Sequence, residues 1–263
     1  MGQPPLHAEK FHIQGGDIVI PVLGPTGSGK STFINHLLGT ESMEVGHQTT
    51  SCTTEPCPGI IIPIPNFPNL RDRRLVILDT PGFDDTYTKD PVIVKNIADW
   101  LSQYRRKGAS IGGVLYLHDI STRRFTSTPN KNLHTLCHIC GDASLKRTIM
   151  VTTNWDSITN NVLSEREEEM KARHWNGIIE KGACVRRFLL GSSESAWDII
   201  NVLLRRADGP PGVLQIQEEM VDRGIGFQNT EAGGNLLRVA EKKREQERQQ
   251  EKTFKKKSLC VVQ

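Results

Sequence analysis

The sequence contains no apolar run that could cross a lipid bilayer. Its longest apolar stretch, residues 59–65, falls far short of the roughly 20 residues that a membrane-spanning helix requires. The first ten residues also lack the apolar core of a secretory signal peptide. We therefore expect neither a membrane-spanning segment nor export.

Cysteine is too sparse to indicate a disulfide-stabilised protein. Six cysteines are scattered over 263 residues, which is typical of reduced thiols in the cytosol. Residues 137–140, Cys-His-Ile-Cys, with His134 one helical turn earlier, could supply half of a zinc site. No second pair with suitable spacing follows, so we favour a plain helix that ends at Gly141.

Outside the C-terminal region, positively and negatively charged side chains nearly balance. Residues 241–257 hold eight lysines or arginines and four glutamates, a local balance of +4, whereas the whole chain carries +3. The remainder of the chain therefore has a balance of −1 (3 − 4). This distribution predicts a basic tail and argues against nucleic acid as a partner.

One octapeptide has a specific chemical meaning. Residues 24–31 read Gly-Pro-Thr-Gly-Ser-Gly-Lys-Ser, the G-x-x-x-x-G-K-[ST] phosphate-binding pattern. A short apolar run, 17–23, precedes it, and a stretch with helical spacing, 30–38, follows, so the pattern lies between a strand and a helix. Glycine permits the backbone conformations that turn successive N–H groups toward one anion.

We assign the phosphates of a nucleotide to this loop. Its amides and the positive end of the helix dipole would hold phosphate oxygens. Lys30 would reach the β- and γ-phosphates, and the Ser31 hydroxyl would bind Mg²⁺. The predicted nucleotide-binding residues here are Gly24, Pro25, Thr26, Gly27, Ser28, Gly29, Lys30, Ser31 and Thr32.

Two later segments have the features of nucleotide switches. Residues 39–58 are predicted to be a long loop, and its hydroxyl side chains at 49–54 could offer a threonine to Mg²⁺ and the γ-phosphate. Spacing alone does not select the threonine, and a merely polar loop is the alternative. The apolar run 74–79 ends in Asp79, where an aspartate that holds Mg²⁺ through water belongs. Gly82 could present its N–H to the γ-phosphate.

Later strands lead to candidates for base recognition. Asp156 follows the predicted strand 147–153. An aspartate there can accept hydrogen bonds from N1–H and the N2 amino group of guanine, a donor pair that adenine lacks. Gly191 and Ser192 follow another predicted strand and lie where a base-contacting loop would be. His118, near the end of the strand 112–120, could act as a base, but we favour a structural role.

Strands alternate with helices along the chain, which indicates an α/β fold, a three-layer P-loop NTPase domain with a mostly parallel sheet. We divide the chain into a loose N-terminus (1–15), a nucleotide-binding domain (16–207), a helical extension (208–254) and a polybasic tail (255–263). Further predicted elements are strands at 60–65 and 186–190, helices at 90–106, 129–140, 196–205, 213–222 and 231–253, and a helix capped by Ser164.

The last residues predict a lipid anchor. Cys260, two aliphatic residues and Gln263 match a C-a-a-X box of the farnesyl type. The lysines at 255–257 would add attraction to an anionic membrane surface. We expect a prenyltransferase to modify Cys260, and the protein to lie on the cytoplasmic face of a membrane with a cytosolic pool. A free thiol on a solvated tail is the alternative.

Together, the motifs resemble the septin-like branch of the GTPases, above all the immunity-associated (AIG-type, or GIMAP) G domains and the plastid Toc GTPases, and most closely fungal G-domain proteins of that kind. The residues that carry the resemblance are 24–31, 51–53, 79–86, 116–118 and 151–156. The resemblance covers about residues 17–206. It implies binding of GTP or GDP with Mg²⁺, homodimers across the nucleotide face, and Thr53 as the switch threonine that joins Ser31 and Asp79 at the metal.

Two positions depart from the family's pattern. The N-K-x-D motif is Thr-Asn-Trp-Asp at 153–156, which keeps Asp156 but lacks the lysine that lies along the base. Phe83 stands after Gly82, where Ras-like enzymes carry the glutamine that positions water. We therefore expect a membrane-associated GTPase switch with slow intrinsic hydrolysis, unless a dimer partner completes the site. The rivals are a GTP-dependent membrane scaffold with negligible turnover and a P-loop kinase or ATPase.

Overall fold

The apolar runs of the sequence form the strands of one sheet in the computed structural model, which describes residues 12–43, 45, 55–82, 90–122, 127–156, 160–206 and 212–259. Four central strands are almost wholly buried, namely β1 (Ile18–Leu23), β3 (Leu75–Asp79), β5 (Val114–Asp119) and β6 (Thr148–Thr153). Continuous apolar runs are expected in strands that are covered on both faces.

The strands follow the order β2-β3-β1-β5-β6-β7, and the short β4 (Ser110–Ile111) pairs with the start of β1. All described pairs are parallel except that of β2 (Cys57–Ile61) with β3 at one edge. The strand β7 (Cys184–Arg187) forms the other edge. The predicted α/β architecture with a mostly parallel sheet is confirmed.

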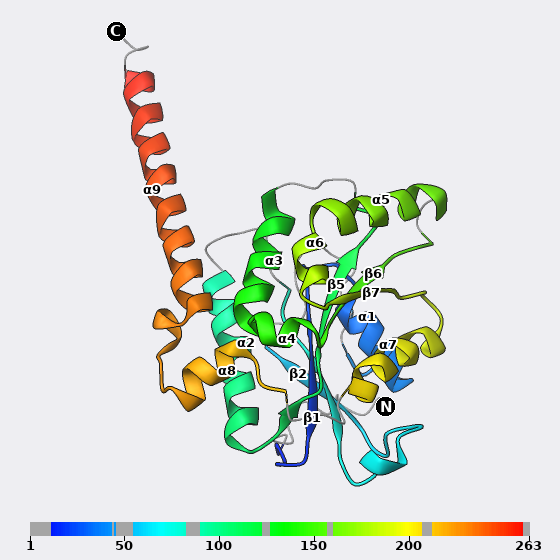
Figure 1. The fold of residues 1–263 in the computed structure, drawn as a ribbon. Helices are drawn as coiled ribbons and strands as arrows, with labels where there is room; N and C mark the ends of the chain where they lie inside the picture. Colours follow the sequence, from blue (N-terminus) through cyan, green and yellow to red (C-terminus); the bar gives the residue numbers. More distant parts are fainter. Residues whose placement is uncertain are drawn as a thin grey trace, which may run out of the picture.

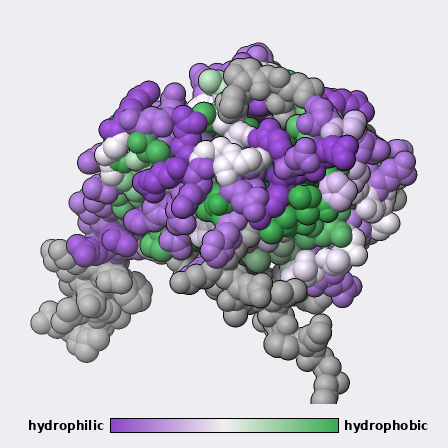
Figure 2. Space-filling model, turned by 90° about the horizontal axis from the view of Figure 1, so that it is seen from below, coloured by the Kyte–Doolittle hydropathy of each residue, from purple (hydrophilic) through white to green (hydrophobic). Residues whose placement is uncertain are grey.

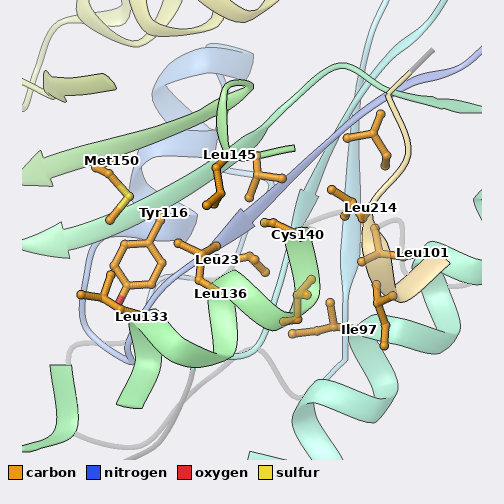
Figure 3. Packing of buried hydrophobic residues seen from close by; sticks show 14 of the residues in the cluster. Leu23, Ile97, Leu101, Tyr116, Leu133, Leu136, Cys140, Leu145, Met150 and Leu214 are labelled. Carbon is orange, nitrogen blue, oxygen red and sulfur yellow. The ribbon is translucent and has the colours of Figure 1, made fainter. Parts of the chain in front are cut away.

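Helices cover both faces of the sheet (Figure 1). On one face lie α1 (Lys30–Leu38) and α7 (Ser193–Arg206), which contact each other. The other face is covered by α2 (Asp90–Arg106), α3 (Ser127–Cys140), α5 (Asn160–Arg173) and α6 (Asn176–Glu180). Figure 3 shows this second layer, where Leu133 and Leu136 of α3 pack toward Leu23 and Tyr116 of the sheet.

The segment after residue 211 packs onto the same side of the molecule. Leu214 and Ile216 are fully buried at α8 (Gln215–Gln217), which contacts α2 and α3. The turns η2 (Glu218–Asp222) and η3 (Phe227–Asn229) lead into α9 (Glu231–Leu259). Figure 1 shows that α9 starts beside α2 and extends away from the rest of the molecule. The predicted boundary at 207–208 lies among residues that the structure does not describe.

Three predicted boundaries are wrong. The edge strand β2 covers 57–61 instead of 60–65, because its ladder with β3 pairs Cys57 with Asp79 and ends at Ile61. The strand β7 covers 184–187 instead of 186–190, since it follows the register of β6. Ser164 does not cap a helix, because α5 begins four residues earlier and buries Leu163 in the core. Five short elements were not predicted, namely β4, α6, η3, α4 (Asp142–Leu145) and η1 (Pro68–Leu70).

The described surface has few large apolar side chains. Seen from below the view of Figure 1, the molecule is mainly hydrophilic, with hydrophobic side chains gathered in a few separate areas (Figure 2). The exposed ones in the described residues include Ile60 and Ile62 near the β2 edge. None of the described helices combines the length and the hydrophobicity that a membrane span requires.

Candidate functional site

The phosphate-binding pattern forms a tight turn between the end of β1 and the start of α1. Gly24, Gly27 and Gly29 have φ values of 144°, 78° and 84°, a region that residues with a side chain rarely adopt. A Cβ atom on Gly24 would lie 2.4 Å from the carbonyl oxygen of Leu117 on β5. The glycines therefore let the loop approach the neighbouring strand and turn back into the helix.

The loop ends at the first turn of α1, which is left open to an anion. Gly29 is the N-cap residue, and no side chain caps this end of the helix or places a carboxylate in its first turn. The free N–H groups and the helix dipole attract negative charge. The Thr26 and Ser28 hydroxyl oxygens are buried and have no hydrogen-bond partner among the described residues. These features fit a phosphate group.

Lys30 lies within this loop. Its side chain is buried, with 7% exposure, and Nζ donates to the carbonyl oxygens of Pro25 (2.9 Å) and Gly24 (3.2 Å). Burial lowers the pKa of Lys30 to about 8, although the negative charge of Asp79 opposes the shift. A buried cation held mainly by neutral carbonyls would gain from a phosphate anion beside it.

Asp79 and Ser31 meet although 48 positions separate them. The Ser31 hydroxyl donates to Oδ2 of Asp79 at 2.7 Å, and the Asp79 side chain is 1% exposed. The next residue, Thr80, donates its hydroxyl to the carbonyl of Val22 at 2.7 Å and so ties the end of β3 to β1. A hydroxyl beside a buried carboxylate is the oxygen donor set that Mg²⁺ prefers. The residues present therefore fit this metal ion.

Gly82 lies directly against the phosphate-binding loop. A Cβ atom on Gly82 would lie between 2.4 and 2.6 Å from the Thr26 backbone and side chain. Only glycine allows this approach, which brings the segment after β3 to the place predicted for the γ-phosphate. Thr53 and Phe83 lie outside the described residues.

The predicted base-recognition segment adjoins the same loop. Thr153, the last residue of β6, donates its hydroxyl to the carbonyl of Ser28 at 3.0 Å. Asn154 has a left-handed φ of 59°, and after this turn Trp155 is buried while Asp156 is exposed. The side chain of Asp156 is therefore accessible to a ligand, and it lies three residues after Thr153, which is bonded to the phosphate-binding loop.

The loop after β7 closes the other side of the candidate site. The backbone N–H of Gly191 donates to Nε2 of His36 on α1 at 3.2 Å. The Ser192 hydroxyl accepts a hydrogen bond from the N–H of Ser195 at 3.0 Å, so it caps α7. The structure thus gathers four segments at one edge of the sheet, which are the phosphate-binding loop, the end of β3, the end of β6 and the loop after β7.

Two other candidates do not join this site. His118 is 8% exposed, and its ring packs edge-on against Trp175 with centroids 5.8 Å apart. This packing supports the structural role. In the described part of the chain no group of three or more His, Cys, Asp or Glu side chains could hold a metal ion, so Cys137 and Cys140 form no zinc site there. Cys260 lies outside the described residues.

Three contributors to the site were not predicted from the sequence. Thr153 was known as a motif position, but its bond to Ser28 depends on the meeting of β6 with the loop. His36 gave no signal beyond a place on a predicted helix. The third is Arg187 on β7. Its guanidinium carbon lies 4.0 Å from the ring centroid of Trp155, a contact that depends on the pairing of β7 with β6 and that the sequence does not reveal.

Comparisons with known proteins agree with this architecture. The sequence model of the AIG1 family matches residues 18–190. Two structures of Toc33 from Arabidopsis thaliana are similar to the chain, one in complex with GDP and Mg²⁺ and one of a dimerization-deficient mutant. Each shares 17% sequence identity with the chain, and the alignment covers 73% of the chain and 84% of Toc33. The TM-score is 0.55 in both cases.

A structure of Era also has a similar fold. Aquifex aeolicus Era bound to GDP·AlF4⁻ shares 19% identity, covers 75% of the chain and 58% of its own length, and gives a TM-score of 0.51. A comparison with curated protein sequences found no match. At these identities the structural likeness establishes the fold, and the likeness to fungal proteins stays a prediction.

Proposed function

The chain belongs to the AIG1 family, and from this premise we propose that it binds GTP and GDP with Mg²⁺ and hydrolyses GTP slowly as a nucleotide switch. The observation that carries the proposal is the hydrogen bond of 2.7 Å between Ser31 and Asp79 beside the buried Lys30. This bond joins the end of β3 to the start of α1, next to Lys30, and so supports the assignment of Ser31 and Asp79 to Mg²⁺ and of Lys30 to the phosphates. Toc33, which has the same fold, was crystallised with GDP and Mg²⁺.

Each residue has a defined task in this proposal. The amides of residues 24–31 and the Lys30 ammonium bind the phosphates, and Ser31 and Asp79 would hold Mg²⁺, with Thr53 as the third predicted ligand. Mg²⁺ held there would supply positive charge against the charge that develops on the phosphate oxygens. Gly82 presents its N–H to the γ-phosphate. Asp156 accepts hydrogen bonds from guanine, and Gly191 and Ser192 border the base.

Slow turnover is part of the proposal because Phe83 cannot orient a water molecule. We also propose that two copies meet across the nucleotide face, since a mutant of Toc33 is described as dimerization-deficient. If the partner completes the site, the specific activity of the purified chain should rise with protein concentration. A specific activity that is constant from dilute to concentrated protein would contradict catalysis across a dimer.

Nucleotide binding tests the central proposal. We expect the purified chain to bind GTP and GDP with Mg²⁺ and to discriminate strongly against ATP in a fluorescent-nucleotide titration. Lys30→Ala removes a charged hydrogen-bond donor and should weaken GTP binding about 10- to 100-fold. Lys95→Ala, which breaks an exposed ion pair with Asp99, is the matched control and should change nothing.

The base assignment has its own variant. Asp156→Asn replaces a double acceptor with a side chain that can donate, so preference should shift from GTP toward xanthosine triphosphate. If ATP binds as tightly as GTP in the unaltered chain, the guanine assignment is wrong. A P-loop kinase or ATPase would then be the better description.

We propose in addition that Cys260 is prenylated and that the lysines at 255–257 attract anionic lipid. The proposal rests on the sequence pattern alone. Mass spectrometry of the protein from eukaryotic cells should detect a farnesyl group on the peptide that contains Cys260. Cys260→Ser should remove the group and shift the protein from the membrane fraction to the cytosol.

A further inference from the structure

The segment that carries Asp156 adjoins a connected set of polar and aromatic side chains around a buried carboxylate. Its centre is Glu167 of α5, a carboxylate with only 2% exposure of its side chain. Oε2 of Glu167 accepts hydrogen bonds from Nη2 (2.7 Å) and Nε (3.0 Å) of Arg187 on β7. Oε1 accepts a hydrogen bond from the Thr152 hydroxyl at 2.9 Å. Three separate elements, β6, β7 and α5, therefore meet at one carboxylate.

Trp155 connects this set to the base-recognition segment. Its indole Nε1 donates to the carbonyl oxygen (3.2 Å) and the hydroxyl (3.1 Å) of Thr152. The guanidinium carbon of Arg187 lies 4.0 Å from the centroid of the Trp155 ring, within the range of a cation–π contact. Arg187 thus holds Glu167 through its hydrogen bonds and Trp155 through its planar face.

Ionisation of Glu167 keeps the set together. Burial by itself raises the pKa of Glu167, but hydrogen bonds from Arg187, Thr152 and Lys171 outweigh that effect, so its pKa lies below the usual value. Lys171 adds a second cation, with Nζ 3.2 Å from Oε2. The buried carboxylate is therefore charged near neutral pH and fully paired, and removal of one partner would leave it undercompensated.

The placement of Trp155 bears directly on Asp156. Trp155 is 6% exposed and is the buried anchor of a short turn whose neighbours are Asn154, with a left-handed φ of 59°, and the exposed Asp156. On the other side of the turn, Thr153 is bonded to the phosphate-binding loop. An exposed carboxylate next to a clamped anchor loses less freedom when it binds a base than one on a loose loop.

We propose that Arg187, Glu167 and Trp155 are positioning residues that hold Asp156 in place to select guanine, in a motif that lacks the lysine that lies along the base. The inference rests on the proposed function, because it concerns the same base site. None of the three residues need touch the nucleotide. They act through the backbone of residues 153–156, which they fix between the sheet and α5.

The test uses the ratio of affinities for GDP and inosine diphosphate. The two nucleotides differ only in the N2 amino group, which one oxygen of a correctly placed Asp156 would bind. A general loss of folded protein weakens both nucleotides equally, whereas a displaced Asp156 lowers the ratio. Binding is measured by isothermal titration calorimetry with Mg²⁺ on the full chain, and the thermal midpoint of each variant is recorded separately.

Two variants and one control test the inference. Arg187→Met keeps a long side chain over Trp155 but removes the charge and both hydrogen bonds, and Trp155→Phe keeps a buried ring but removes the indole donor. We expect each to reduce the ratio by about tenfold, the value of one charged hydrogen bond, with nearly unchanged affinity for inosine diphosphate. Arg186→Met is the matched control, because the Arg186 guanidinium donates to the Val185 carbonyl of its own strand.

Partial rescue adds a further check. Arg187→Lys keeps a cation near Glu167 but loses the planar, two-pronged donor, so its ratio should fall between those of Arg187→Met and the unaltered chain. If Trp155→Phe and Arg187→Met both keep the unaltered ratio, the inference is wrong while the proposed function stands. If the unaltered chain does not prefer GDP to ADP, the guanine assignment fails, and this inference fails with it.

Discussion

At the scale of single residues, His118 shows how burial decides a role that the sequence left open. Burial lowers the pKa of His118 to about 4, an effect that Asp119 opposes and His174 reinforces. The ring is therefore neutral near pH 7 and packs against Trp175. A side chain in this environment stabilises the fold only while it remains unprotonated.

This predicts an acid-dependent loss of stability. The unfolded chain binds a proton at His118 near pH 6.5, whereas the folded chain does so near pH 4, so the stabilisation is complete above pH 6.5 and is lost as the pH falls toward 4. Between pH 7 and pH 5 the free energy of unfolding should fall by about 2 kcal/mol on account of this group. Urea unfolding at the two pH values measures the change.

The His118→Gln variant isolates the effect. It cannot take up the proton, so its free energy of unfolding should depend less on pH than that of the unaltered chain by the same amount. His134→Gln, at an exposed position of α3, is the control and should retain the full dependence. Equal pH dependence in His118→Gln and the unaltered chain would show that His118 is not the titrating group.

At the scale of elements, the unit of β1, loop and α1 contains glycines with different demands. Gly24 has a φ of 144° and no space for a Cβ atom because of the Leu117 carbonyl. Gly39, the C-cap residue of α1, has a φ of 65° but open space around it. The first glycine meets both a conformational and a steric requirement, and the second meets only a conformational one.

Alanine substitution should separate the two requirements. Gly39→Ala should cost about 1 kcal/mol of unfolding free energy, the usual penalty for a left-handed residue with a side chain. Gly24→Ala should cost more than about 2 kcal/mol, because the backbone of the loop must also move. Urea unfolding of both variants measures the difference. Equal costs would mean that the loop relaxes away from β5 without penalty.

At the scale of the whole molecule, the C-terminal segment has two different parts. Leu214, Ile216, Phe227 and Leu236 are buried against the nucleotide-binding domain, and Gln217 Nε2 donates to the Leu101 carbonyl of α2 at 2.7 Å. From residue 241 to residue 250 almost every side chain of α9 is exposed. The first part belongs to the core of the molecule, and the second contributes little to it.

Truncation should distinguish these parts. A chain that ends at Arg244 should keep its unfolding free energy within about 0.5 kcal/mol, since the side chains described beyond that point, those of residues 245–250, are all exposed. A chain that ends at Arg206 exposes the apolar surface that Leu214, Ile216 and Leu236 cover and should lose more than about 5 kcal/mol, at roughly 1.5–3 kcal/mol for each side chain. Urea unfolding of both chains is the measurement, and comparable stability would show that the extension is not part of the core.

The sequence by itself determined the features that a continuous stretch of chain can encode. The phosphate-binding loop at 24–31 and the apolar strands that lead to Asp79 and Thr153 were identified correctly, because glycine conformation and hydrophobic periodicity are local properties. The α/β order followed from the alternation of these elements.

Only the tertiary structure decided which distant residues meet. The bond of Ser31 to Asp79, the bond of Thr153 to Ser28 and the stacking of Arg187 on Trp155 join positions on different strands and helices. The ends of β2 and β7 likewise followed the register of their neighbours. The physical reason is that hydrogen bonding and side-chain packing across a sheet depend on the position of a partner that no local pattern specifies.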